Sequence, residues 1–287
     1  MKKAEDLIKI ADDTLEIIRE GGYQIPGSSE WIDLAPSLRQ MIYNSIWVKS
    51  ANYPQQQLKL KRINLGFPTN IIVENIDCVE KAREWGKEEG VVLLNMASSW
   101  TPGGGFLKGS KAQEEEICRR TTLIPGLYKY WEERNKIFPE LFKEEKKSSP
   151  KYPMDRYEFI YTSGVNIIRD KNYNLLSTPE VTNVMTFAAI RKPKLLPDGN
   201  MIPACVKIMR NKIKLLLYFL AEWGFKKLIL GAWGCGAYKC PPFQVANLFK
   251  EVLGELDGYF EDVCFAIIDN PLKKENNYQI FKSVLCQ

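Results

Sequence analysis

Runs of apolar and polar residues along this chain predict helices and strands in alternation. Residues 4–20 carry apolar side chains at helical spacing, and Gly21-Gly22 ends that pattern. A second helical pattern covers residues 31–49. Continuous apolar runs rich in β-branched residues, at 70–74, 91–97 and 227–230, predict strands that are covered on both faces.

The rest of the chain continues this alternation. Further helices are predicted at 77–88, 204–223 and 242–256, and further strands at 157–162, 165–169, 181–188 and 262–268. This order predicts an α/β protein with three layers, in which ligands bind at the carboxyl ends of the strands. With no repeat and no clear linker, we expect one domain over 1–287, with a helical N-terminal extension (1–65) and an α/β core (66–287).

Charge and hydropathy exclude several classes of protein. The 40 Lys and Arg residues exceed the 35 Asp and Glu residues only slightly, and no long basic run concentrates the excess. Direct nucleic-acid binding is therefore not expected. No apolar run is long enough to cross a bilayer. The amphipathic, acid-containing start resembles neither a signal nor a transit peptide, so we expect a cytoplasmic protein without a membrane partner.

The chain contains no histidine. Ser-His-Asp and Cys-His pairs and zinc sites with His ligands are thereby excluded. The seven cysteines include no CxxC pair, which is typical of reduced thiols and predicts no metal site. Acid-base chemistry must therefore use Glu, Asp, Lys, Tyr or Cys. A nucleophilic thiol at Cys235 is an alternative, although no imidazole is present to activate it.

Two glycine-rich loops follow predicted strands. Gly103, Gly104 and Gly105 come after the strand at 91–97, and the loop 231–236 precedes a helix that begins near Pro241-Pro242. Such loops offer backbone N–H groups to phosphates, although each is also typical of an ordinary tight turn. Neither has the spacing of a Walker A or a dinucleotide-binding motif.

An acidic cluster, Glu114-Glu115-Glu116, falls in the first turn of the helix after the first loop. Carboxylates are favourable at a helix N-terminus, so the cluster has a structural explanation as well as a catalytic one. Successive helical residues point about 100° apart. At most two of the three carboxylates therefore face a ligand, and the rest are solvated or paired with a basic residue such as Arg119 or Arg120.

Gly103-Gly104-Gly105, seven intervening residues and then Gln113-Glu114-Glu115 resemble the signature of poly(ADP-ribose) glycohydrolases, in particular their microbial-type members. Other segments resemble the family in the same order over roughly 5–270. They are Ala11-Asp12-Asp13-Thr14, Leu94-Asn95-Met96-Ala97-Ser98, Val165-Asn166-Ile167-Ile168-Arg169-Asp170, Gly231-Ala232-Trp233-Gly234-Cys235-Gly236-Ala237-Tyr238 and Phe265-Ala266-Ile267-Ile268-Asp269.

The resemblance implies a macrodomain-like mixed sheet between helical layers and hydrolysis of the ribose–ribose bond of poly(ADP-ribose) without metal or cofactor. Poly(ADP-ribose) or ADP-ribosylated protein would be the substrate and ADP-ribose the product. By position, the resemblance implies that Glu115 is the acid/base, that Glu114 binds the ribose hydroxyls, and that Gln113 supports the orientation of both. It also implies that Gly103, Gly104 and Gly105 lie beside the ribose and phosphates, and that Asn95 binds a ribose hydroxyl. It further implies contacts to the diphosphate from Gly234, Cys235, Gly236 and Ala237, to the terminal ribose from Tyr238, and to the adenine from Ile76 and Asp77.

Two other functions remain open at this point. A mono-ADP-ribosyl hydrolase, acting on protein or nucleic acid, would use the same chemistry on a different leaving group. A non-catalytic ADP-ribose-binding module would use the same loops, but it would not need the Gln-Glu-Glu sequence. The chain also departs from the pattern at Ser98, where related macrodomains often have a second Asn, and at Thr162-Ser163-Gly164.

Overall fold

The computed structural model describes residues 2–49, 60, 64–86, 88–143, 151–269 and 276–286. The chain forms two compact units, and each unit combines two stretches of sequence. The first contains residues 1–49 and 97–188, and the second contains residues 50–96 and 189–287. The predicted division at residue 65 stays a prediction.

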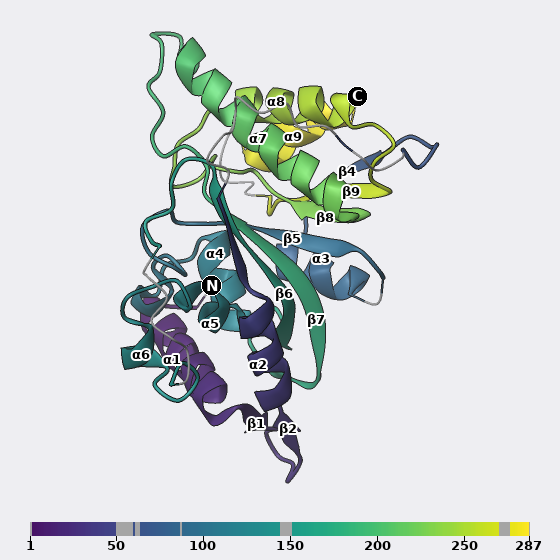
Figure 1. Ribbon diagram of the computed structural model, residues 1–287. Coiled ribbons are helices and arrows are strands. Elements are labelled where there is room, and N and C mark those ends of the chain that lie inside the picture. The colour runs from purple at the N-terminus through teal and green to yellow at the C-terminus, as the bar shows by residue number, and fades with distance from the viewer. Residues whose placement is uncertain are drawn as a thin grey trace. The chain divides into compact units, whose positions relative to one another are not determined.

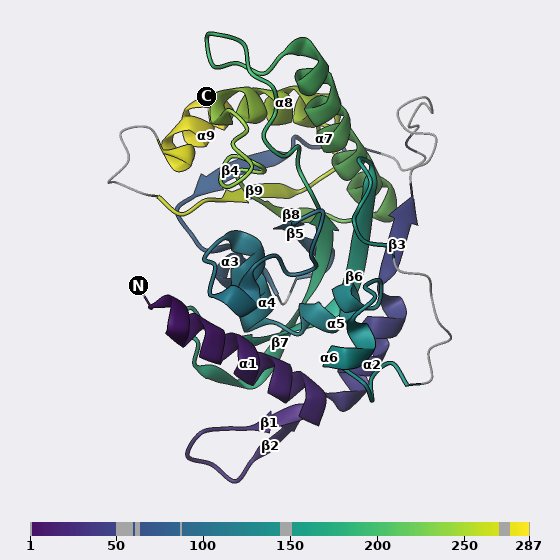
Figure 2. The same cartoon turned by 90° about the vertical axis from the view of Figure 1, so that its left-hand side faces the viewer.

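The first unit begins with helix α1 (Ala4–Glu20), whose apolar face buries Leu7, Ala11, Leu15 and Ile18. Gly21 ends this helix with a left-handed φ of 75°, which costs glycine little. An antiparallel hairpin follows, made of β1 (Gly22–Gln24) and β2 (Trp31–Asp33). Figure 2 shows this hairpin at the C-terminal end of α1. Helix α1 itself packs against α4 (Gln113–Arg120).

An antiparallel sheet forms the centre of the first unit. Strand β6 (Glu158–Arg169) lies between β3 (Ile46–Lys49) and β7 (Leu175–Phe187). Helices α2 (Ala35–Asn44) and α5 (Leu123–Tyr128) pack against β6 (Figure 1). The short helices η1 (Phe106–Lys108) and α6 (Arg134–Ile137) complete this unit.

The second unit contains a parallel sheet in the order β5 (Val91–Met96), β8 (Lys227–Leu230), β9 (Asp262–Ala266) and β4 (Asn70–Glu74). Helices α7 (Pro203–Trp223), α8 (Pro242–Glu255) and α9 (Asn277–Leu285) cover one face, and α3 (Cys78–Trp85) covers the other (Figure 1). Three layers therefore enclose an apolar core that includes Leu228, Ile229, Val263 and Phe265.

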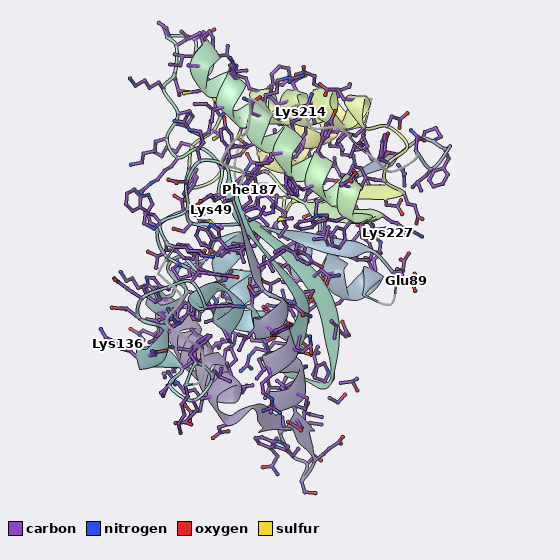
Figure 3. The ribbon with its side chains drawn as sticks, in the orientation of Figure 1. Lys49, Glu89, Lys136, Phe187, Lys214 and Lys227 are labelled. Atoms are coloured by element: carbon purple, nitrogen blue, oxygen red, sulfur yellow. The ribbon has the colours of Figure 1, made fainter. Side chains whose placement is uncertain are left out.

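Ion pairs of Lys227 link neighbouring segments of the second unit. Lys227, which is labelled in Figure 3 at the start of β8, has its Nζ 2.8 Å from Asp262 and 2.5 Å from Glu88. These carboxylates raise the pKa of the Lys227 ammonium, against the opposing effect of desolvation. The pair with Asp262 ties the first residues of two neighbouring strands together.

Antiparallel strands in the first unit and parallel strands in the second, both with helices packed on them, confirm the mixed α/β class. The expectation of a helix throughout 31–49 is wrong, because only Ala35–Asn44 is helical and β2 and β3 flank it. The strands expected at 157–162 and 165–169 are a single strand, β6. Its register with β7 shifts between Thr162 and Val165, where Gly164 adopts a φ of 73°.

Candidate active site

The first glycine loop leaves the end of β5 and folds back over the N-terminus of α4. Gly103 and Gly104 adopt φ values of 76° and 58°, which only glycine adopts without strain. Backbone bonds from Gly104 N to Thr101 O and from Phe106 N to Gly103 O close two successive turns. The turns aim the N–H groups of Gly103 and Gly105 at the first residues of α4.

Glu114 anchors this loop. Its two carboxylate oxygens accept hydrogen bonds from Ser98 N at 2.7 Å and Gly103 N at 3.1 Å. The side chain is only 4% exposed. A carboxylate that accepts bonds from backbone N–H groups on both sides of a turn fixes the course of the backbone between them. Glu114 therefore determines the shape of the loop.

Glu115 is held at one oxygen only. Oε1 accepts a hydrogen bond from Gly105 N at 2.9 Å. The whole residue is only 8% exposed, and Oε2 is buried without a hydrogen-bond partner in the part of the chain that the structure describes. A buried carboxylate oxygen without a partner is costly to stability, and such atoms are concentrated at functional sites.

Glu116 points away from these two carboxylates. Its oxygens accept hydrogen bonds from Arg119 Nη2 at 2.6 Å and from the Tyr173 hydroxyl at 2.5 Å. Desolvation and the hydrogen bond to Glu116 raise the pKa of Tyr173 to about 12, so its hydroxyl stays a donor. The expectation that part of the acidic cluster pairs with a nearby basic residue is confirmed.

Arg119 is fully buried and reaches the far side of the same loop. Besides its pair with Glu116, Nη2 donates to Ser110 O at 2.6 Å, and Nη1 lies 3.5 Å from Phe106 O. Ser110 in turn lies against Gly105, since a Cβ atom built there would be 2.4 Å from its Oγ. The guanidinium thus supports the segment that presents Gly105 N to Glu115.

The remaining predicted residue of the first unit, Gln113, is the first residue of α4 and is partly exposed. Its orienting role stays a prediction.

In the second unit, Asn95 is fully buried near the end of β5, and Ile76 and Asp77 follow β4. Asp77 is the N-cap of α3, because its Oδ1 accepts hydrogen bonds from Val79 N at 2.9 Å and Glu80 N at 3.1 Å. This structural role was missed in the sequence, although an Asp before an apolar helical run is a recognised cap signal. The adenine contact stays a prediction.

The loop 231–238 offers unused backbone donors. Its turns are closed by bonds from Cys235 N to Ala232 O and from Cys240 N to Gly234 O. The N–H groups of Gly234, Gly236 and Ala237 donate to no acceptor within the described ranges. Gly234, with a φ of 81°, lies so close to its neighbours that a Cβ atom would be 2.8 Å from Ala189 Cβ and 2.9 Å from Cys240 Sγ.

Two further residues of this loop were predicted to contact ligand. Tyr238 is partly exposed. Desolvation, with a smaller contribution from Cys240, raises the pKa of the Cys235 thiol well above its usual value. Because the thiolate is the nucleophilic form, this shift disfavours the alternative of a thiol enzyme.

Sequence reasoning missed one partner in the first unit, Tyr173, which lies 57 residues from Glu116 in the chain and has no local signal. Among the described residues, no group of three or more Cys, Asp and Glu side chains is placed to hold a metal ion. None of the helices that the structure describes is long and apolar enough to cross a membrane.

Comparison with known proteins gives a consistent result. The family described as "Microbial-type PARG, catalytic domain" matches residues 11–170. The poly(ADP-ribose) glycohydrolase of Thermomonospora curvata has a similar structure, with a TM-score of 0.79, 28% identity and coverage of 97% of this chain and 99% of that one. The same enzyme bound to the inhibitor ADP-HPD gives a TM-score of 0.74 at 27% identity, with the same coverage of both chains.

The Deinococcus radiodurans enzyme in complex with ADP-ribose is also similar, with a TM-score of 0.67 and 27% identity over 92% of this chain and 98% of that one. No curated protein matches the chain. The family match covers more than half of the sequence, and the solved structures cover nearly all of it. The chain belongs to the microbial-type poly(ADP-ribose) glycohydrolases.

Proposed function

We propose that this protein hydrolyses the ribose–ribose O-glycosidic bond of poly(ADP-ribose) and releases ADP-ribose, with Glu115 as the acid and base. The observation that carries this proposal is the carboxylate of Glu115. One oxygen is fixed by Gly105 N, and the other is buried and has no protein partner in the described residues. This oxygen therefore has an unused capacity for hydrogen bonding, which we assign to the substrate.

In the proposed reaction, protonated Glu115 gives its proton to the ribosyl oxygen that leaves as the glycosidic bond breaks. The sugar acquires oxocarbenium character, and the ionised Glu115 then takes a proton from the attacking water. One water is consumed, and Glu115 returns to its protonated form. Most glycosidases divide these tasks between two carboxylates on opposite sides of the sugar. Glu114 is already bound to Ser98 N and Gly103 N, which favours a single residue with both roles.

Glu114 and the triple glycine support this reaction indirectly. The loop that Glu114 holds has no side chains at Gly103, Gly104 and Gly105, so a ribose can approach the carboxylates closely. We assign the backbone donors of Gly234, Gly236 and Ala237, in the second unit, to the diphosphate of ADP-ribose. Solved relatives in complex with ADP-ribose and with ADP-HPD support a ligand of this class.

Glu115→Gln tests the proposal because it preserves the shape of the side chain and removes its proton transfer. Release of ADP-ribose from poly(ADP-ribose) should fall by about 10²-fold or more, while calorimetric binding of ADP-ribose is retained. Glu132→Gln makes the same change on an exposed glutamate and should leave turnover unchanged. Normal turnover by Glu115→Gln would show that the assignment is wrong. A wild-type protein that binds ADP-ribose but releases none from polymer would exclude the glycohydrolase function.

A further inference from the structure

In the second unit, residues 189–192 run directly along the loop 234–240. Ala189 lies against Gly234, where a Cβ atom would be 2.8 Å from Ala189 Cβ. The Cys240 thiol donates to Ile190 O at 3.2 Å, and Lys192 N donates to Tyr238 O at 2.8 Å. Three successive contacts therefore fix this segment beside the loop that carries the unused N–H donors.

The next residues are also held in place. Ile202 N donates to Lys194 O at 3.0 Å, and Leu195 and Met201 form an isolated β-bridge. Met201 N donates to the Gln244 side chain at 2.6 Å, which ties the excursion to α8. Lys194 therefore stands at the base of a closed turn.

Two lysines at this contact adopt unusual backbone conformations. Lys192 has a φ of 46° and Lys239 a φ of 57°, values that are uncommon for residues with side chains. Left-handed conformations at residues other than glycine are strained and are concentrated at functional sites. Here both belong to cationic residues beside the same loop.

Four cations beside this loop have no partner carboxylate among the residues that the structure describes. Arg191, Lys192, Lys194 and Lys239, which we call the basic rim, are all exposed and form no ion pair with any residue that the structure describes. Residues 231–244 contain no acidic residue, and the one carboxylate in 189–202, Asp198, bonds to Asn200.

Two cations of the neighbouring helix α7 are paired. Arg210 and Lys214 of α7 pair with Glu251 and Glu255 of α8, and Lys214 is labelled in Figure 3. These two partly buried cations thus find carboxylate partners, whereas the four exposed cations of the basic rim do not. Uncompensated charge of one sign raises the local concentration of an oppositely charged ligand.

We propose that the basic rim binds phosphates of the poly(ADP-ribose) chain beyond the ADP-ribose unit that the loop 231–238 holds. This inference rests on the proposed function. Each unit of the polymer carries one diphosphate. The N–H groups of Gly234, Gly236 and Ala237 provide enough donors to bind a single diphosphate. The four additional cations match a polyanion that continues past this diphosphate, so the rim selects polymer over a single ADP-ribosyl group.

The triple variant Arg191→Gln, Lys192→Gln, Lys194→Gln tests the rim and leaves the loop itself intact. KM for long poly(ADP-ribose) should rise about tenfold with kcat unchanged, and the dependence of kcat/KM on salt should weaken. Calorimetric binding of free ADP-ribose, which has no diphosphate beyond the one that the loop holds, should show little change in Kd. The matched control, Lys9→Gln, Lys250→Gln, Lys282→Gln, removes the same charge from exposed positions elsewhere.

An unchanged KM and salt dependence for long polymer would overturn the proposal, as would an equal loss of affinity for free ADP-ribose or an equal effect of the control. A fall in kcat at constant KM would also overturn it, because the rim is assigned to binding alone. Failure of the proposed function is a separate result. In that case the wild-type protein would release no ADP-ribose from poly(ADP-ribose).

Discussion

Gly104 lies so close to Glu115 that a Cβ atom built on it would be 2.6 Å from Glu115 Oε1 and 2.9 Å from Glu114 Oε2. The backbone of the glycine loop is therefore packed directly against both carboxylates. Each carboxylate is also bound to this loop through backbone N–H groups. A side chain at Gly104 can be accommodated only if these hydrogen-bonded groups move.

We predict that Gly104→Ala abolishes most activity without unfolding the protein. The added methyl group displaces the Glu115 carboxylate, and the φ of 58° adds a backbone cost of about 1–2 kcal/mol. Initial rates on poly(ADP-ribose) and thermal melting measure the two effects. Gly27→Ala is the matched control, because Gly27 has a φ of 81° and no atom within 4 Å of the added Cβ. It should lose similar stability but no activity, and an equal loss of activity in both variants would contradict the steric explanation.

Glu114→Gln and Glu115→Gln should differ in stability. Both oxygens of Glu114 accept backbone hydrogen bonds. In Glu114→Gln the amide oxygen can accept one of them but the NH₂ cannot accept the other, so the free energy of unfolding should fall by about 1–3 kcal/mol. Glu115→Gln keeps its single bond to Gly105 through the amide oxygen and should be as stable as wild type or more so. Urea unfolding of the two variants measures the difference. Equal destabilisation would show that the hydrogen bonds of Glu114 do not hold the loop.

Arg119 supplies a third test, since it supports the catalytic loop without a predicted contact to substrate. Arg119→Met leaves Glu116 without its cation and Ser110 O without its donor, and a partly buried group that loses its hydrogen-bond partner costs about 1–3 kcal/mol. We expect kcat to fall while KM changes little, because Gly105 N is no longer held toward Glu115. Arg119→Lys should restore part of the stability and part of kcat. A stability loss with normal kcat would restrict Arg119 to a purely structural role.

Local features of the sequence predicted much of this site. The glycines specified a tight loop after a buried strand, and the 100° rotation between helical residues predicted that Glu114, Glu115 and Glu116 do not all face one way. The helices near 4–20, 77–88, 204–223 and 242–256 were also predicted, because their apolar spacing or their Gly and Pro end signals are local.

Features that depend on distant partners were not predicted. The hydroxyl of Tyr173 reaches Glu116 only because β6 and β7 bring it there, and no local pattern marks it. Strand β6 appeared as two strands because Thr162-Ser163-Gly164 interrupts the apolar run, whereas pairing with β7 continues on both sides of the bulge. The short strands β2 and β3, which flank α2, were predicted as helix. Their pairing with other strands, β1 and β6, outweighs the local helical spacing.

Tyr23 gives a prediction about pH. Its hydroxyl donates to Leu176 O at 2.6 Å, and burial raises its pKa from 10.0 to about 12, although the charge of Arg169 opposes the shift. Because the folded state keeps this proton more strongly than the unfolded state, the stabilising effect is complete below pH 10. It is lost as pH rises toward 12. At pH 11 the expected loss is about 1.4 kcal/mol.

Tyr23→Phe removes both the hydrogen bond and the titration. Near pH 8 the wild type should be more stable than the variant by about 0.5–1.5 kcal/mol, the usual contribution of one hydrogen bond. The difference should shrink above pH 10 and approach zero or reverse near pH 11, because only the wild type loses stability through this residue. Urea unfolding at pH 8, 9, 10 and 11 measures the difference, and Tyr43→Phe, at an exposed tyrosine, serves as the control. A difference between wild type and Tyr23→Phe that stays constant across this range would show that Tyr23 does not keep its proton in the folded protein.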